Sequence, residues 1–200
     1  VIALGMFASW GPHRLTIGAL VGALGAAGLV YLISMAQGGM TPLRLVLSGV
    51  VLSAAFSALA SFLVFRSSDP RAAQSVLYWM LGSVAGATWD SLWVAAIVTA
   101  LSAVLMIAFS GWLDALAAGT DVARSLGIPD TRVRKALFVG NSVLVGVLVA
   151  VSGGIGFVGL VIPHMSRLLV GASHRSMVPV AAAIGSLFLL WVDVGARVIA

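Results

Sequence analysis

The sequence predicts an all-α protein, a polytopic transmembrane helical bundle, from its composition and the distribution of its charges. Of the 200 residues, 61% are hydrophobic and 8% are charged, and the mean hydropathy is +1.15. Soluble domains carry roughly a quarter charged residues, so this chain lacks the charge to cover a globule in water. The composition excludes soluble enzymes, disordered tails and disulfide scaffolds, and the absence of cysteine excludes thiolate catalysis.

Charge-free stretches of about 20 residues, the length that crosses a bilayer, place the spans. We expect about six full spans, over residues 15–36, 43–65, 91–112, 133–151, 156–170 and 178–198. Residues 1–10 are also apolar and lack the initiator Met and the basic start of a signal peptide. We therefore expect a single transmembrane domain over residues 1–200 that is truncated at both ends.

The segment at residues 72–89 has two interpretations. It is uncharged but polar, and its aromatic residues Tyr78, Trp79 and Trp89 are typical of a membrane interface. If it lies in the interface, the basic residues divide seven to four between the two sides; if it spans, they divide nine to two, which the positive-inside rule prefers. Either topology puts residues 113–135 in the cytoplasm. The net charge of +5 is thus explained by topology, and no nucleic-acid partner is expected.

Residues 113–127 predict two short cytoplasmic helices. Asp114 is expected to cap the first helix, Gly119 to break it, Thr120 to cap the second and Gly127 to end it. The apolar residues of the two helices are Leu116, Ala117, Val122, Ala123 and Leu126. This face is too small for a core of its own. It packs either under the bundle or into a groove on a partner subunit, and the spacing does not decide between the two.

A glycine-rich stretch at residues 152–164 interrupts the next apolar interval. Gly153, Gly154 and Gly156 weaken helix continuity, and Pro163 removes a backbone hydrogen bond, so we expect a broken or shortened helix. Such a break either lines a wet cavity, as in transporters, or forms a tight turn between two helices. His164 is expected to be a satisfied helix-end residue rather than a metal ligand.

Small residues recur at helical spacing on two of the spans. One stripe either packs closely against another helix, the commoner case, or lines a pathway, and it consists of Gly49, Ser53, Ser57 and Ser61. A second set is expected to be a packing face and consists of Gly18, Gly22, Gly25 and Gly28, with Gly82 and Gly86 repeating the spacing.

Ionisable residues are few, and they indicate a chain without catalytic chemistry of its own. Asp193 and Arg197, four residues apart, are expected to form a structural ion pair, with a proton relay as the alternative. The three histidines lie far apart in sequence, so no metal site is expected. The only lysine, Lys135, is outside any phosphate-binding loop, and glutamate is absent. We therefore expect neither ATP hydrolysis nor acid–base catalysis on this chain.

Five segments carry a resemblance to a known family: RLVLSG from Arg44, YWMLGS from Tyr78, residues 116–127 ending in ARSLG, GFVGLVIPH from Gly156, and DVGAR from Asp193. In this order, over nearly the whole chain, they resemble the iron-siderophore, haem and cobalamin permease family of ABC importers. The segment GFVGLVIPH is highly specific. Because family subunits have about ten transmembrane helices, the resemblance implies a piece that runs from the end of the third helix through the ninth.

The resemblance implies an assembly and a set of site residues. It implies a homodimer in the bacterial inner membrane that binds two cytoplasmic ATPase subunits, which carry ATP and Mg, and a periplasmic substrate-binding protein. No cofactor is implied on this chain. The family's coupling helices correspond to residues 113–127, and the implied contact residues are Leu113, Leu116, Ala117, Gly119, Asp121, Ala123, Arg124, Leu126 and Gly127.

The pathway and a structural motif are implied in the same way. The pathway helix corresponds to residues 43–65, which favours lining by the Gly49–Ser61 stripe, with a cytoplasmic gate at Thr41, Pro42 and Leu43. Some relatives have small hydroxyl residues at the last two positions, so the gate is less polar here. The implied structural motif consists of Gly153, Gly154, Gly156, Gly159, Pro163, His164, Asp193 and Arg197. Residues 72–89 correspond to a short periplasmic helix, which favours the seven-to-four division.

The resemblance therefore implies an ATP-driven permease that imports an iron-siderophore, haem or cobalamin-type substrate. The alternative is a proton-coupled secondary transporter that uses Asp193 and Arg197.

Overall fold

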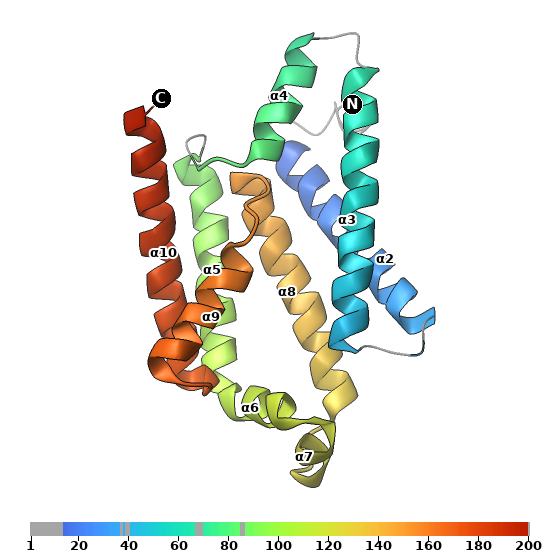
Figure 1. Cartoon of the computed structure of the whole chain (residues 1–200), viewed down its shortest axis with the longest axis vertical. Coiled ribbons are helices and arrows are strands. Elements are labelled where there is room, and N and C mark those ends of the chain that lie inside the picture. Colours follow the sequence, from blue (N-terminus) through green and yellow to red (C-terminus); the bar gives the residue numbers. More distant parts are fainter. Residues whose placement is uncertain (1–13, 37, 39–40, 67–69, 85–86, 200) are drawn as a thin grey trace. The chain divides into compact units, whose positions relative to one another are not determined.

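The described residues of this computed structural model, which are 14–36, 38, 41–66, 70–84 and 87–199, form helices joined by turns (Figure 1). The all-α prediction is confirmed. The helices gather in two compact units. The first contains the residues up to Gly82 together with Val145–Gly154, and the second contains Ser83–Leu144 and the residues from Ile155 onward. The apolar stretch at residues 1–10 lies outside the described residues.

The first unit contains α2 (Arg14–Ala36), α3 (Pro42–Phe65), α4 (Pro70–Leu81) and the last turns of α8 (Asp130–Ser152). Helix α3 packs against both α2 and α4. Thr41 is the N-cap of α3, because its hydroxyl oxygen accepts the N–H of Arg44 at 3.4 Å. Pro42 takes the first helical position, where its missing N–H costs nothing. Pro42 and Leu43 therefore belong to the first turn of α3 and not to a loop before it.

The second unit contains α5 (Trp89–Ala108), α6 (Ser110–Ala118), α7 (Thr120–Ser125), the first part of α8, α9 (Val158–Val170) and α10 (His174–Ile199). Figure 1 shows α5 and α10 side by side, and α10 also packs against α9 and α6. A Cβ atom on Gly185 of α10 would lie 3.6 Å from Cγ2 of Ile162 on α9, which is ordinary packing distance.

Five of the described helices are long and apolar enough to cross a membrane, over Gly18–Ala36, Leu43–Phe65, Ser91–Ala108, Asp130–Ser152 and His174–Val198. The expected sixth span is α9, which has 13 residues and is therefore about 20 Å long, against about 30 Å of hydrocarbon. The number of full spans was thus overestimated by one, and the predicted shortening of this helix is confirmed. Helix α4, with 12 residues, is also too short to span, which supports the interfacial interpretation of residues 72–89.

Most apolar side chains of the described residues lie on the surface. The buried hydrophobic residues are Ala95, Ala115, Ala123, Ile128, Val147 and Ile162, whereas large side chains along α3, α5 and α10 are exposed. Apolar faces of this extent need lipid or other membrane-embedded protein against them. Together with the five apolar helices, they make this a multi-pass membrane protein.

Close contact between α2 and α8 depends on a glycine that the sequence analysis did not select. A Cβ atom on Gly146 would lie 3.0 Å from Cβ of Ala23 and 3.2 Å from Cδ1 of Leu20, so a larger residue would require these neighbours to shift. No described residue lies near the Cβ positions of the predicted packing set, which is Gly18, Gly22, Gly25 and Gly28. Gly86 lies outside the described residues.

Candidate functional site

Helices α6 and α7 form an elbow, residues 110–127, that joins α5 to α8 through two changes of direction (Figure 1). Helix α5 ends at Ala108, four residues before the expected end of this span at residue 112. Phe109 is the single residue between α5 and α6. Gly119 separates α6 from α7 with φ 131° and ψ 159°, a conformation open essentially to glycine only. The predicted break at Gly119 is confirmed.

Both predicted N-caps in the elbow are wrong. Helix α6 begins at Ser110, earlier than expected, so Asp114 lies inside α6 and cannot cap it. Thr120 is the first residue of α7, whose N-cap is Gly119. Sequence rules for caps assume that the helix starts at the nearest breaker, and the kink at Phe109 has no breaker residue.

The end of α7 is a Schellman motif centred on Gly127. Gly127 has φ 73°, and its N–H donates to the carbonyl of Arg124 at 2.9 Å. The N–H of Ile128 donates to the carbonyl of Ala123 at 3.0 Å, so two carbonyls at the helix end are satisfied. The predicted stop at Gly127 is confirmed, and the motif turns the chain so that Ile128 packs against Ala123.

The apolar residues of the elbow divide into an inner and an outer group. Ala123 is fully buried in a cluster with Ala115 and Ile128, and Leu116 and Val133 pack against that cluster. The outer group is exposed to solvent in this structure and consists of Ala117, Val122 at 43% and Leu126 at 66%. The sequence left two roles open for these apolar residues, packing under the bundle or docking on a partner. In the structure the inner group packs within the chain, and the outer group is available to contact a partner.

Polar contacts fix α7 to the first turns of α8. The guanidinium of Arg124 donates to both carboxylate oxygens of Asp130, each at 3.3 Å. Nη2 of Arg134 donates to the Thr120 hydroxyl oxygen at 3.4 Å. Arg124, one of the implied contact residues, therefore already has an acidic partner within the chain. Of the other implied residues, Asp121 and Gly127 are exposed, and Leu113 is half-buried.

Asp114 joins α6 to the start of α10. Its Oδ1 accepts the backbone N–H of His174 at 2.9 Å and contacts the ring Nδ1 of the same residue, while Oδ2 accepts the Ser173 hydroxyl at 3.2 Å. The backbone and ring donors of His174 lower the pKa of the Asp114 carboxyl below its ordinary value, and partial desolvation opposes the shift. Asp114 thus caps the N-terminus of α10 rather than that of α6. Sequence reasoning missed this contact because 60 residues separate the partners.

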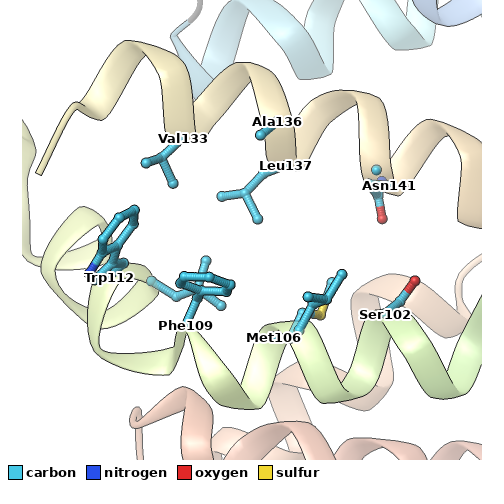
Figure 2. Close-up of a pocket in the computed structure, with 11 residues that line it drawn as sticks. Ser102, Met106, Phe109, Trp112, Val133, Ala136, Leu137 and Asn141 are labelled. Atoms are coloured by element: carbon cyan, nitrogen blue, oxygen red, sulfur yellow. The ribbon is translucent and has the colours of Figure 1, made fainter.

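An apolar groove of about 280 Å³ lies between the α5–α6 junction and α8. Figure 2 shows Val133 and Leu137 on α8 facing Phe109 and Met106, with Trp112 at one end. The rings of Phe109 and Trp112 are 5.4 Å apart between centroids. The polar side chains of Ser102 and Asn141 lie at the other end. The groove needs both helices, so no single stretch of sequence indicates it.

The small-residue stripe on α3 is largely exposed. Ser53, Ser57 and Ser61 are exposed and Gly49 is half-buried, and the Ser61 hydroxyl donates to the carbonyl of Ser57 at 2.9 Å within the helix. At the start of the same helix Thr41 and Leu43 are exposed, Leu43 at 69%. The three serines are therefore accessible to lipid, to another protein chain or to a water-filled pathway.

The glycine-rich motif forms the turn from α8 to α9. Gly153 ends α8 with φ 70°, and Phe157 is the N-cap of α9 in the left-handed region with φ 65°. The Phe157 side chain is 82% exposed, so little packing holds a conformation that is costly for any residue but glycine. His164, expected at a helix end, lies in the middle of α9 and is exposed, next to Pro163. The turn interpretation of Gly153–Gly156 is supported.

Asp193 and Arg197 form the predicted ion pair within α10, with Nε to Oδ2 at 2.8 Å. Their side chains are 25% and 61% exposed. Among the residues that the structure describes, no three histidine or acidic side chains gather as potential metal ligands.

A family model described as the FecCD transport family matches residues 1–200. The chain belongs to this family. It is 36% identical to the cobalamin import system permease protein BtuC of Halobacterium salinarum, over 90% of this chain and 48% of that protein. It is 34% identical to the molybdate import system permease protein MolB of Haemophilus influenzae, over 97% and 58% of the two chains.

A third relative is the iron(3+)-hydroxamate import system permease protein FhuG of Bacillus subtilis, 34% identical over 94% of this chain and 55% of that protein. A solved inward-facing structure of a proposed metal-chelate type ABC transporter superposes with a TM-score of 0.86 at 33% identity, over 99% of this chain and 63% of that one. The chain thus spans about half the length of the curated relatives it matches. The resemblance in the sequence is confirmed.

Proposed function

We propose that this FecCD-family chain is part of the permease subunit of an ABC importer in a bacterial inner membrane, and that its α6–α7 elbow docks on an ATPase subunit. The observation that carries the proposal is the outer group of the elbow. Val122 and Leu126 remain exposed in the elbow, whereas Ala115, Ala123 and Ile128 are buried together and polar contacts hold the elbow to α8 and α10. An apolar patch on a fixed scaffold suits a helix-in-groove contact.

Charging this patch tests the docking. Val122→Asp and Leu126→Asp introduce carboxylates into the proposed contact, and we expect each to abolish co-purification of the ATPase subunit. Leu81→Asp is the matched control, because Leu81 is a leucine with 77% exposure on α4, away from the elbow sequence. Retention of the ATPase by Leu126→Asp at the level of the control would refute the assignment of the elbow.

We infer that ATP binding on the partner closes the paired ATPase subunits and that the elbow passes this movement to the membrane helices, which open the pathway to one side at a time. A periplasmic binding protein delivers the substrate. The names of the relatives suggest three candidate substrates, which are cobalamin, an iron(III)-hydroxamate chelate and molybdate. Haem is a further candidate from the family resemblance in the sequence.

Uptake into proteoliposomes separates this function from a proton-coupled carrier. We expect import of one member of a panel, namely cobalamin, iron(III)-hydroxamate, iron(III)-citrate, haem and molybdate, to require the ATPase subunits and internal ATP. A carrier that uses the Asp193–Arg197 pair would instead work without the ATPase and stop on addition of an uncoupler.

The stripe on α3 is proposed to line the pathway where two copies of the chain meet. A water-soluble thiol reagent tests this, because the chain has no cysteine of its own. Ser57→Cys should react from the aqueous side and be protected by the transported substrate. Leu59→Cys, two residues along the helix and so on a different face, should stay unreactive in lipid. If neither Ser57→Cys nor Leu59→Cys reacts with the reagent in the absence of substrate, the stripe is a helix-packing face rather than a pathway lining.

A further inference from the structure

Asp114 is placed to connect the elbow with the longest helix of the second unit. Helix α6 has the sequence SGWLDALAA, so Asp114 is the one charged residue of this helix. The Asp114 carboxylate accepts a hydrogen bond from the first residue of α10, His174. Ser173, the residue before α10, donates its hydroxyl to the same carboxylate. His174 is largely buried there, with 19% of its side chain exposed. Three donors from two consecutive residues thus converge on one side chain.

We propose that Asp114 is a positioning residue that makes α10 move with the α6–α7 elbow, so that movement received by the elbow enters the membrane through α10. This inference rests on the proposed function, because it assigns the route by which the action of the ATPase reaches the bundle.

The geometry favours this route over the covalent ones. The elbow is joined along the chain only at Phe109, where α5 and α6 meet, and after Gly127, where α8 begins. Phe109 is the single residue between α5 and α6, and α6 changes direction there, so the chain junction with α5 does not by itself determine how α6 lies against α10. The Arg124 and Arg134 contacts tie α7 to α8, whereas the Asp114 contact ties α6 directly to the start of α10.

Helix α10 can carry such a movement over a long distance. It has 26 residues, about 39 Å of helix, with Pro179 in its second turn, and it packs against both α9 and α5. A displacement of its first turn therefore reaches the level of the Asp193–Arg197 pair and the helices that pack on it.

The test measures substrate transported per ATP hydrolysed in proteoliposomes that hold the complete transporter with its ATPase subunits. The probe is whichever of cobalamin, iron(III)-hydroxamate, iron(III)-citrate, haem or molybdate the wild type imports. Asp114→Ala removes all three contacts, and we expect the ratio to fall about fivefold or more while Mg-ATP hydrolysis continues. Asp114→Asn keeps an oxygen for the His174 N–H, and asparagine caps helices as well as aspartate, so its ratio should stay within about twofold of wild type.

Matched variants separate transmission from stability. Ser173→Ala removes one hydrogen bond and should lower the ratio alone, but not further in the Asp114→Ala background. Ser186→Ala removes a hydroxyl on α10 that bonds only to Ala183 of the same helix at 2.9 Å, and should change nothing. Gly146→Ala strains a contact in the first unit and so provides a destabilised protein with an intact Asp114 contact.

Each outcome decides between the two proposals. A wild type without ATP-driven uptake refutes the proposed function itself. A wild type that couples, with Asp114→Ala coupling equally well, overturns only the role of Asp114. Equal loss of the ratio in Asp114→Ala and Gly146→Ala at matched melting temperatures also overturns it, since general stability would then explain the effect. If Asp114→Ala does not fold, the transport ratio of Ser173→Ala is compared with that of Asp114→Asn. An unchanged ratio in Ser173→Ala then overturns the role of Asp114.

Discussion

Replacing Gly119 by alanine tests the geometry of the elbow on which the proposed function depends. An added Cβ would meet no atom within 4 Å, so the cost of the substitution comes from the backbone alone. A residue with a Cβ at φ 131° and ψ 159° costs about 1–3 kcal/mol. Alanine has less conformational entropy than glycine in the unfolded chain, which stabilises the folded state by about 0.4–1 kcal/mol. The net destabilisation is therefore about 1–2 kcal/mol.

For a protein of this size, that destabilisation corresponds to a melting temperature lower by about 2–8 °C. Tryptophan fluorescence of the detergent-solubilised protein measures it, and Gly111→Ala is the matched control. Gly111 lies in α6 with open space around its Cβ position and an ordinary helical φ, so alanine there should leave the melting temperature unchanged or raise it. Equal melting temperatures for the two variants would show that residue 119 does not hold this conformation and would refute the elbow geometry.

Three further predictions concern stability and are read from melting temperatures. Gly146→Leu should cost about 1–3 kcal/mol by overpacking against Leu20 and Ala23, whereas Gly25→Leu should cost far less; similar losses would contradict the α2–α8 contact. Phe157→Gly should stabilise the protein by up to about 1 kcal/mol, because relief of a left-handed residue that is 82% exposed exceeds the entropy that glycine adds to the unfolded chain. A loss of stability would show that the aromatic ring is needed there. Because the folded pKa of Asp114 is lowered, its advantage over Asp114→Asn should be full above about pH 4 and disappear as the pH falls through the lowered value; a pH-independent difference would argue against the ionised cap.

The sequence was a reliable guide to features with local causes. Apolar intervals of sufficient length predicted the five long helices, and the glycines with Pro163 predicted that the helix after residue 152 is shortened. Gly119 and Gly127 were correctly expected to interrupt and end short helices, because positive φ is a property of the residue itself.

Features that depend on a distant partner were not predictable in this way. The four glycines of α2 have the spacing of a packing face, yet the close contact uses Gly146, because the depth of a helix crossing depends on both surfaces. Asp114 has the residue type and position of an N-cap, and it does cap a helix, but one that starts 60 residues later. The sequence therefore predicted correctly that Asp114 caps a helix, but not which helix it caps.

The division of the elbow into inner and outer residues has a consequence for how its surface can vary. Ala123 is fully buried, so a larger residue there would push α7 away from Ile128 and tilt the whole elbow. Ala117, Val122 and Leu126 lie on the exposed side and are not part of that cluster. The orientation of the elbow is therefore set by alanines, glycines and the Arg124 and Asp114 contacts, while the outer side chains are free to match a partner. Substitutions on the outer side can change what the elbow binds without changing where the elbow lies, and substitutions on the inner side cannot.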